Sequence, residues 1–226
     1  MTIIVNGSNT PTAGAVGYGD GTNLAFTSAG TTGQFLSSNG SSAPSWVGAP
    51  ASAMTLISTQ TASSSASISW TGLSGYDKYV MIFENLLPAT TSSALFVQVG
   101  TGSTTYVTSG YAISGTINSN YLYTHSPYAS GVFYVGSATA IYMNNDGTTN
   151  TNQGYSGNLN LFNMNKNNDT CFQGNNVYYV NSTYGYECIN FSGFLVGNST
   201  TKTAIQLFMS SGNITSGTAS LYGISS

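Results

Sequence analysis

The chain has 226 residues, of which 40% are hydrophobic and only 4% are charged, and its formal net charge is −3. Soluble proteins average roughly 25% charged residues, so the polar surface of this chain has to be built from Ser, Thr, Asn and Gly. Three lysines and no arginine argue against binding to nucleic acid phosphates, which needs many cations. No run of 18 apolar residues is present, which argues against membrane insertion through a transmembrane helix.

The N-terminal region, residues 1–50, is rich in Gly, Ser, Thr and Ala and has only short apolar runs. Its first residues, MTIIVNGSNTP, lack the basic stretch and the longer apolar stretch of a secretory signal. No run is long enough to bury a core within one chain, yet large hydrophobic residues recur in a way that a flexible linker does not need. We therefore predict that these side chains pack between chains, the main candidates being Phe26, Phe35, Leu36 and Trp46.

A strand pattern follows a connector that we place at residues 51–65. Ala66, Ile68 and Trp70 alternate with serines, which predicts a strand with one apolar face. The continuous apolar run YVMIF, residues 79–83, predicts a strand that is covered on both faces. Further short strands are expected in the apolar segments 95–99, 106–113, 132–135, 138–143, 159–164, 177–180, 188–196, 204–209 and 219–224.

Turn sequences such as Asn145-Asp146-Gly147 separate these segments, and no amphipathic helix is apparent. Many short strands at near-regular spacing are typical of a β-sandwich or a jelly roll. We therefore predict an all-β protein in which residues 66–226 form one β-sandwich head that resembles a jelly roll.

Residues that could hold a metal are few. For a chain folded in cytoplasm, we favour two half-buried thiols in neighbouring strands over a disulfide for Cys171 and Cys188, the only two cysteines. These two cysteines and the single histidine, His125, lack the spacing of a zinc site. The loop around Asp146 lacks the terminal glutamate of an EF-hand. We predict no metal and no cofactor.

Catalytic groups are equally scarce. His125 would need a nucleophile and an orienting carboxylate that only the fold could bring to it. Glycoside cleavage needs two acids that face one cleft, and Asp146 with Asp169 or Glu187 is the only plausible source of such a pair. We expect the protein not to be an enzyme, with a polysaccharide depolymerase as the less favoured alternative.

Tyrosines among asparagines and serines form the best candidate binding surface in the sequence. Tyrosine offers a flat apolar face and a hydroxyl, and asparagine and serine offer adaptable hydrogen bonds, a pairing that also serves antibody loops. Such a surface could stack on a sugar ring, although each tyrosine could instead pack inside the sandwich. The predicted receptor-binding residues are Tyr121, Tyr123, His125, Tyr128, Tyr155, Tyr184 and Tyr186.

Two segments resemble a known class of proteins. Residues 17–47 read GYGDGTNLAFTSAG and then TTGQFLSSNGSSAPSWV, and this pattern resembles one that is common in tail-fibre and related adhesion proteins of tailed bacteriophages. Residues 67–102, SISWTGLSGYDKYVMIFENLLPATTSSALFVQVGTG, look like the start of the β-sandwich that such proteins often carry at the C-terminus. Nothing beyond residue 102 carries a resemblance.

The resemblance implies a virion protein that is made in the host cytoplasm and attaches the phage to its host. Fibres of this kind are usually homotrimers, so the four hydrophobic residues named above would form a core from three chains. Residues 1–50 would then form an extended, intertwined segment that trimerises and attaches to other virion proteins of the tail or baseplate. The head would bind a host surface glycan or protein. The alternative is a capsid decoration or head fibre protein with a mainly structural role.

Overall fold

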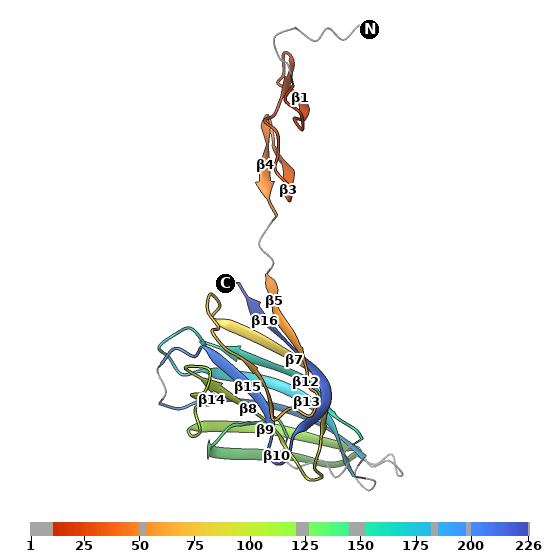
Figure 1. The fold of residues 1–226 in the computed structure, drawn as a ribbon, viewed down its shortest axis with the longest axis vertical. Helices are drawn as coiled ribbons and strands as arrows, with labels where there is room; N and C mark the ends of the chain where they lie inside the picture. Colours follow the sequence, from red (N-terminus) through yellow and green to blue (C-terminus); the bar gives the residue numbers. More distant parts are fainter. Residues whose placement is uncertain are drawn as a thin grey trace. The chain divides into compact units, whose positions relative to one another are not determined.

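A computed structural model describes residues 11–49, 53–120, 127–144, 152–181, 185–197 and 200–225. The chain divides into two compact units, an N-terminal unit (Met1–Ser52) and a C-terminal unit (Ala53–Ser226) (Figure 1). The regular structure of the described residues is all β-strand, arranged in several sheets that stay open, and the all-β prediction is confirmed. Within these same residues, no helix has the length and apolar character needed to cross a membrane.

The N-terminal unit contains two antiparallel hairpins. Strand β1 (Gly17–Gly19) pairs with β2 (Leu24–Phe26), and β3 (Gln34–Asn39) pairs with β4 (Ser42–Gly48). Asp20 organises the turn of the first hairpin, because its carboxylate accepts hydrogen bonds from the backbone N–H groups of the two residues that follow Gly21, at 2.8 and 2.6 Å. The GDG sequence thus forms a tight connection between two short strands.

None of the described residues of the N-terminal unit is buried. Trp46 packs locally: its ring would lie 2.6 Å from a Cβ placed on Gly30, and its indole N–H donates to the carbonyl of Ser28 at 2.8 Å. Phe35 faces Val47 across the second hairpin and is 59% exposed. The described part of this unit therefore has no core of its own. The packing of Phe26, Phe35, Leu36 and Trp46 between chains stays a prediction.

The C-terminal unit begins earlier than the sequence indicated. Strand β5 (Met54–Thr61) lies within the stretch that we expected to be a connector, and it pairs with β16 (Ile214–Ile224) at one edge of a sheet. Its inward positions carry polar residues rather than apolar ones. Ser58 accepts a hydrogen bond from the Trp70 indole at 3.0 Å, and the Gln60 amide donates to the carbonyl of Ser69 at 2.6 Å. This strand consequently lacks the apolar alternation that marks strands in a sequence.

Two antiparallel sheets make up the C-terminal unit (Figure 1). The larger sheet has eight strands in the order β10 (Pro127–Ala138), β9 (Tyr111–Asn120), β14 (Gly185–Leu195), β13 (Cys171–Asn181), β12 (Tyr155–Phe162), β7 (Lys78–Pro88), β16 and β5. The smaller sheet has four strands in the order β11 (Ile141–Tyr142), β8 (Leu95–Gly100), β15 (Ala204–Met209) and β6 (Ser67–Trp70).

One hydrophobic core joins the two sheets. Val97 and Leu207 enter it from the smaller sheet, and Met81, Leu161 and Ile189 enter it from the larger sheet, all five fully buried. Burial of one such side chain stabilises a fold by about 1.5–3 kcal/mol. The alternation of apolar and polar residues along these strands therefore decides which face of each sheet turns toward the other.

The YVMIF run, residues 79–83 in β7, is covered on one face only. Tyr79, Met81 and Phe83 are buried, whereas Val80 is half-buried and Ile82 is 37% exposed. Our prediction of a strand covered on both faces is wrong, because the smaller sheet covers the inner face of the larger sheet alone. The outer face of the larger sheet is left accessible.

Glycines in the larger sheet make room for phenylalanine rings on its inner side. A Cβ placed on Gly174 would lie 2.7 Å from the ring of Phe191 on the neighbouring strand, and a Cβ on Gly115 would lie 2.5 Å from the ring of Phe133. Gly in a strand commonly marks such a close approach. In QGN (173–175) and SGT (114–116), the glycine faces inward and the polar residues on either side of it face outward.

Candidate functional site

Tyr155 is a core residue and not a surface contact. It is fully buried, its ring stacks on that of Tyr178 with the ring centroids 5.3 Å apart, and its hydroxyl donates to the carbonyl of Ser93. Its predicted role in receptor binding is wrong, because the first residue of β12 points toward the smaller sheet. A tyrosine next to a loop in the sequence is thus part of the interior in the fold.

The other predicted receptor-binding residues are only partly covered by the structure. Tyr186, at the start of β14, is 45% exposed and meets Tyr179 of β13 edge to face, with the ring centroids 5.4 Å apart. The predicted contacts that lie outside the described residues are Tyr121, Tyr123, His125, Tyr184 and the side chain of Tyr128.

A second candidate surface lies on the outer face of the larger sheet. Strand register brings Thr116, Asn190, Asn175 and Asn158 into one row across β9, β14, β13 and β12. A parallel row two residues further along the strands contains Ser114, Ser192, Gln173 and Asn160. We call these eight residues the amide face. Each of the eight side chains is exposed or half-buried.

The amide face lines an open hollow of about 590 Å³, to which Lys78, Val132 and Phe162 also contribute. Among the described residues that line it, Lys78 is the one charged side chain. The Lys78 amine lies 5.1 Å from the centroid of the Phe162 ring, within cation–π range. The hollow therefore presents hydroxyls and amides with almost no formal charge.

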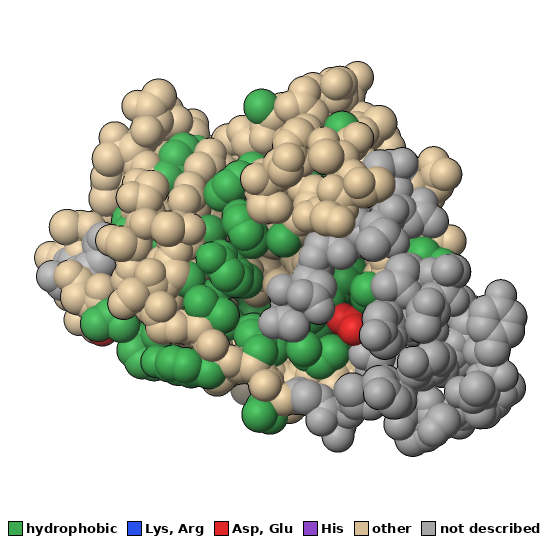
Figure 2. All heavy atoms as spheres, turned by 90° about the horizontal axis from the view of Figure 1, so that it is seen from below, with side chains coloured by type: hydrophobic (Ala, Val, Ile, Leu, Met, Phe, Trp, Pro, Cys, Tyr) green, Lys and Arg blue, Asp and Glu red, His purple; other side chains and the backbone are tan. Residues whose placement is uncertain are grey.

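Exposed apolar side chains border the amide face on three sides. On β10, Val132 and Tyr134 pair with Thr116 and Ser114 and are 86% and 75% exposed. Phe194, 47% exposed, and Phe162 lie in the next row along the strands, and Ile82 continues the first row onto β7. Figure 2 shows the molecule from below, the side on which β10 lies in Figure 1. At this β10 end of the C-terminal unit, hydrophobic side chains gather in a hollow between polar ridges, and among the described charged side chains acids are visible but no lysine.

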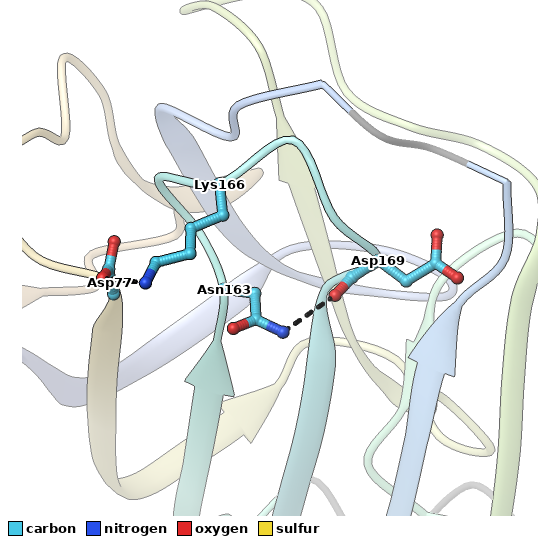
Figure 3. A network of polar contacts seen from close by, with 4 residues as sticks. All are labelled: Asp77, Asn163, Lys166 and Asp169. Atoms are coloured by element: carbon cyan, nitrogen blue, oxygen red, sulfur yellow. Dashed lines mark hydrogen bonds and ion pairs between the residues drawn. The ribbon is translucent and has the colours of Figure 1, made fainter.

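The turn between β12 and β13 fixes one end of the site. Lys166 forms an ion pair with Asp77 at 2.8 Å, and the Asn163 amide donates to the backbone carbonyl of Asp169 at 3.3 Å (Figure 3). The ion pair is well exposed, so its contribution to stability is small. These contacts hold the turn from which β13 leads Cys171 and Gln173 onto the outer face.

Both cysteines are free thiols on neighbouring strands, as we favoured, but only Cys188 is half-buried, whereas Cys171 is exposed. Cys171 pairs with Phe194, whereas Cys188 pairs with Val177, so the two positions are six residues apart along β13. At about 3.4 Å per residue this is roughly 20 Å, far beyond the reach of a disulfide. Among the described residues, no three His, Cys, Asp or Glu side chains gather in a group that could hold a metal ion.

The two acids proposed as partners of Asp146 in an alternative catalytic site, Asp169 and Glu187, lie at opposite ends of β13. Glu187 is largely buried beside β13, where the Tyr178 hydroxyl donates to its carboxylate at 2.6 Å. Asp169 is exposed in the turn at the opposite end of β13. Asp146 lies outside the described residues, so its predicted partnership with either acid stays a prediction.

The sequence carries a signal for the amide face that the choice of tyrosines near loops overlooks. In NLNLF (158–162) polar and apolar residues alternate, and in QGN (173–175) and SGT (114–116) a glycine separates two polar residues. These short patterns mark a strand with one polar face. Only the strand order shows that the polar faces adjoin, because Thr116 and Asn190 are 74 positions apart in the sequence.

Comparisons with protein-family models, with curated proteins and with solved structures found no match to this chain.

Proposed function

We propose that the chain is a virion protein of a tailed bacteriophage, a tail fibre that binds a glycan on the host surface during adsorption. The observation that supports it best is the amide face, which offers eight uncharged polar side chains in register beside exposed aromatic rings. Amides and hydroxyls both donate and accept hydrogen bonds, as the hydroxyls of a sugar do. The resemblance of residues 17–47 to phage adhesion proteins adds the virion context.

We infer that the C-terminal unit is a β-sandwich related to the jelly roll. Its two antiparallel sheets share one core, and the outward faces of both sheets carry Ser and Gln, joined by Asn on the larger sheet. A sandwich presents a rigid sheet surface, and binding sites built on strands are held more precisely than sites on loops. We propose binding and not catalysis, since the amide face includes no carboxylate among its eight residues.

We further propose that residues 1–50 trimerise and attach the protein to the tail or baseplate. Phe35 and Leu36 are exposed in the described chain and are therefore available to other chains, while Phe26 and Trp46 are half-buried. Association would remove these side chains from water. Mass measurement of the full-length protein in solution tests this step: a trimeric mass supports it, and a monomeric mass contradicts it.

Immunogold labelling of intact virions with an antibody against residues 53–226 tests the proposed function. Label at the tail or baseplate supports host attachment, and the purified full-length protein should then reduce phage adsorption by occupying the receptor. Label spread over the capsid would contradict the tail-fibre assignment and favour the decoration protein. Soluble host polysaccharide that is bound without being shortened separates an adhesin from a depolymerase.

A further inference from the structure

We propose that the amide face binds a neutral, hydroxyl-rich polysaccharide that runs across the strands of the larger sheet, in place of a receptor held by the tyrosine-rich loops. The inference rests on the proposed function, because it locates the glycan site and specifies the chemical class of the glycan. Nothing in the sequence resemblance extends to β9, β12, β13 or β14, so the geometry of the sheet alone supports this site.

The direction of the ligand follows from the register of the two rows. Neighbouring strands in a sheet lie about 4.8 Å apart, which is close to the length of one sugar ring in an extended chain. Thr116, Asn190, Asn175 and Asn158 therefore offer one polar side chain per sugar unit, and the second row repeats the pattern about 7 Å away along the strands. A chain laid across the strands could engage both rows at once.

The amides of the face retain hydrogen-bonding capacity for a ligand. The Asn158 amide nitrogen donates to the side-chain oxygen of Asn175, and the Asn160 amide nitrogen donates to the backbone carbonyl of Gln173. Both nitrogen–oxygen distances are 3.4 Å, at the long end of the hydrogen-bond range. A side-chain amide has two N–H donors and a carbonyl with two lone pairs. The contacts between neighbouring strands thus use a small part of what the face offers, and they hold the side chains in a preferred orientation.

The apolar border supplies surfaces for the C–H faces of sugar rings. The Tyr134 hydroxyl would lie 3.1 Å from a Cβ on Gly136, so the ring leans along β10 over a residue without a side chain. Phe194 and Phe162 offer further rings at the side of the second row. Protein partners usually meet a hydrophobic centre with a polar rim. Here the centre is polar and the rings are at the border, which favours a glycan over a protein.

The charge of the face selects for a neutral ligand. Lys78 is the one charged side chain among the described residues that line the hollow, and its amine already lies over the ring of Phe162. An acidic polysaccharide would need several cations to offset its repeated charge, and the face does not provide them. Binding by amides and hydroxyls should also change little with salt, since there is little charge to screen.

Binding of the full-length protein to immobilised polysaccharides tests the site, with a panel of neutral glucans, mannans and galactans and with alginate as the acidic probe. We expect binding to at least one neutral polysaccharide, unchanged between low and high salt, and none to alginate. The double variant Asn175→Ala/Asn190→Ala should weaken that binding by roughly four- to 140-fold, since each of the two lost hydrogen bonds costs roughly two- to twelvefold. Both side chains are exposed, so the fold should be retained.

Gln206→Ala is the matched control, because it removes an amide from the outer face of the smaller sheet. It should leave polysaccharide binding unchanged, and so should loss of the loop-adjacent ring in Tyr186→Ala. Tyr134→Ala should weaken binding by removing a ring at the border. No binding to any neutral polysaccharide, or equal binding by the wild type and the double variant, overturns the inference.

Adsorption assays with the same proteins separate this inference from the proposed function. Wild-type protein that blocks phage adsorption, together with a double variant that blocks it equally well, overturns the amide face as the site and leaves the adhesin function standing. Capsid labelling together with polysaccharide binding that the double variant loses rejects the tail-fibre role and supports the site. If the wild type binds polysaccharide and blocks adsorption while the double variant does neither, the result supports both the amide-face site and the adhesin function.

Discussion

The N-terminal and C-terminal units differ in how far they bury their hydrophobic side chains, although both are built from strands and carry little charge. In the C-terminal unit, two sheets face one another and bury side chains such as Leu161 and Ile189 completely. In the N-terminal unit, single hairpins leave Phe35 and Leu36 exposed, and none of its described residues is buried. Strand formation alone therefore does not bury a core; a second layer has to cover the apolar face.

The largest expected effect comes from truncating one leucine in each unit. Leu161→Ala removes a fully buried side chain and should lower the free energy of unfolding of the C-terminal unit by about 2–5 kcal/mol. Leu36→Ala, in the N-terminal unit, should leave that transition within about 0.5 kcal/mol. Urea unfolding followed by far-ultraviolet circular dichroism measures both. Equal losses would show that the stability of the two units is coupled and would remove the contrast between them.

A matched pair of glycines should give the next largest effect. An added Cβ on Gly174 would lie 2.5 Å from the carbonyl oxygen of Asn158, so Gly174→Ala should destabilise the C-terminal unit by about 1–3 kcal/mol. A Cβ on Gly48 meets no atom of the described residues within 4 Å, and Gly48→Ala should therefore be nearly neutral. Thermal unfolding of both variants checks the contrast. An unchanged melting temperature for Gly174→Ala would mean that β12 and β13 can move apart at no cost.

The same contrast explains which features could be predicted from the sequence. Strands with a buried face, such as the one around Ile68 and Trp70, carry an apolar alternation that the sequence displays directly. Strand β5 could not be predicted in this way because its inward positions hold Ser58 and Gln60, whose polar groups find partners only in the folded unit. An alternation of apolar and polar residues indicates a strand with one buried face. It misses a strand such as β5, whose inward side chains make hydrogen bonds instead of apolar contacts.

The candidate site was harder to predict than the fold. The amide face depends on the order β9, β14, β13, β12, which joins strands that are distant in the sequence. Composition drew attention to tyrosines near loops, and Tyr155 shows the weakness of that reasoning, since its ring lies in the core. Residue types predict the chemistry that a surface could perform, whereas long-range register decides which residues share that surface.

Alkaline pH should act on the C-terminal unit through Lys202, one of the three lysines of the chain, all of which lie in this unit. Lys202 is buried, and burial lowers its pKa while the charge of Asp169 opposes the shift. Between the lowered pKa and the unfolded value of about 10.4, the unfolded chain binds more protons than the folded chain. The free energy of unfolding should therefore rise as the pH increases through this window.

Lys202→Met tests this assignment. The free energy of unfolding is measured at a series of pH values from about 7 to about 10, a range that ends just below the lysine pKa of the unfolded chain. The variant should lose the rise in stability that the wild type shows, while Lys166→Met, which removes an exposed lysine, should keep it. A rise that persists in Lys202→Met would assign the pH dependence to a group other than Lys202. The buried Tyr79 and Tyr111 could not produce it, because burial raises their pKa and stability is then lost as the pH rises.

The smallest expected effect is that of acidic pH on the N-terminal unit, where Asp20 is the one carboxylate of residues 1–52. Hydrogen bonds from the backbone N–H groups of Asn23 and Thr22 lower its pKa. A carboxyl group whose pKa is lowered in the folded state stabilises the turn above its unfolded pKa. That stabilisation is lost as the pH falls through the lowered value. The amide proton shifts of both residues, followed by NMR, should report a midpoint below the ordinary aspartate value.

Asp20→Asn separates the charge of Asp20 from its geometry. The asparagine carbonyl can accept the same two hydrogen bonds, so the β1–β2 hairpin should persist while its response to acid disappears. The C-terminal unit should be unaffected, since the titrating group belongs to the other unit. If the hairpin signals of Asp20→Asn still moved with acid, the turn would not be controlled by this carboxylate. If instead the hairpin were lost at neutral pH, its stability would depend on the negative charge, and this exposed unit would rely on electrostatics where the C-terminal unit relies on burial.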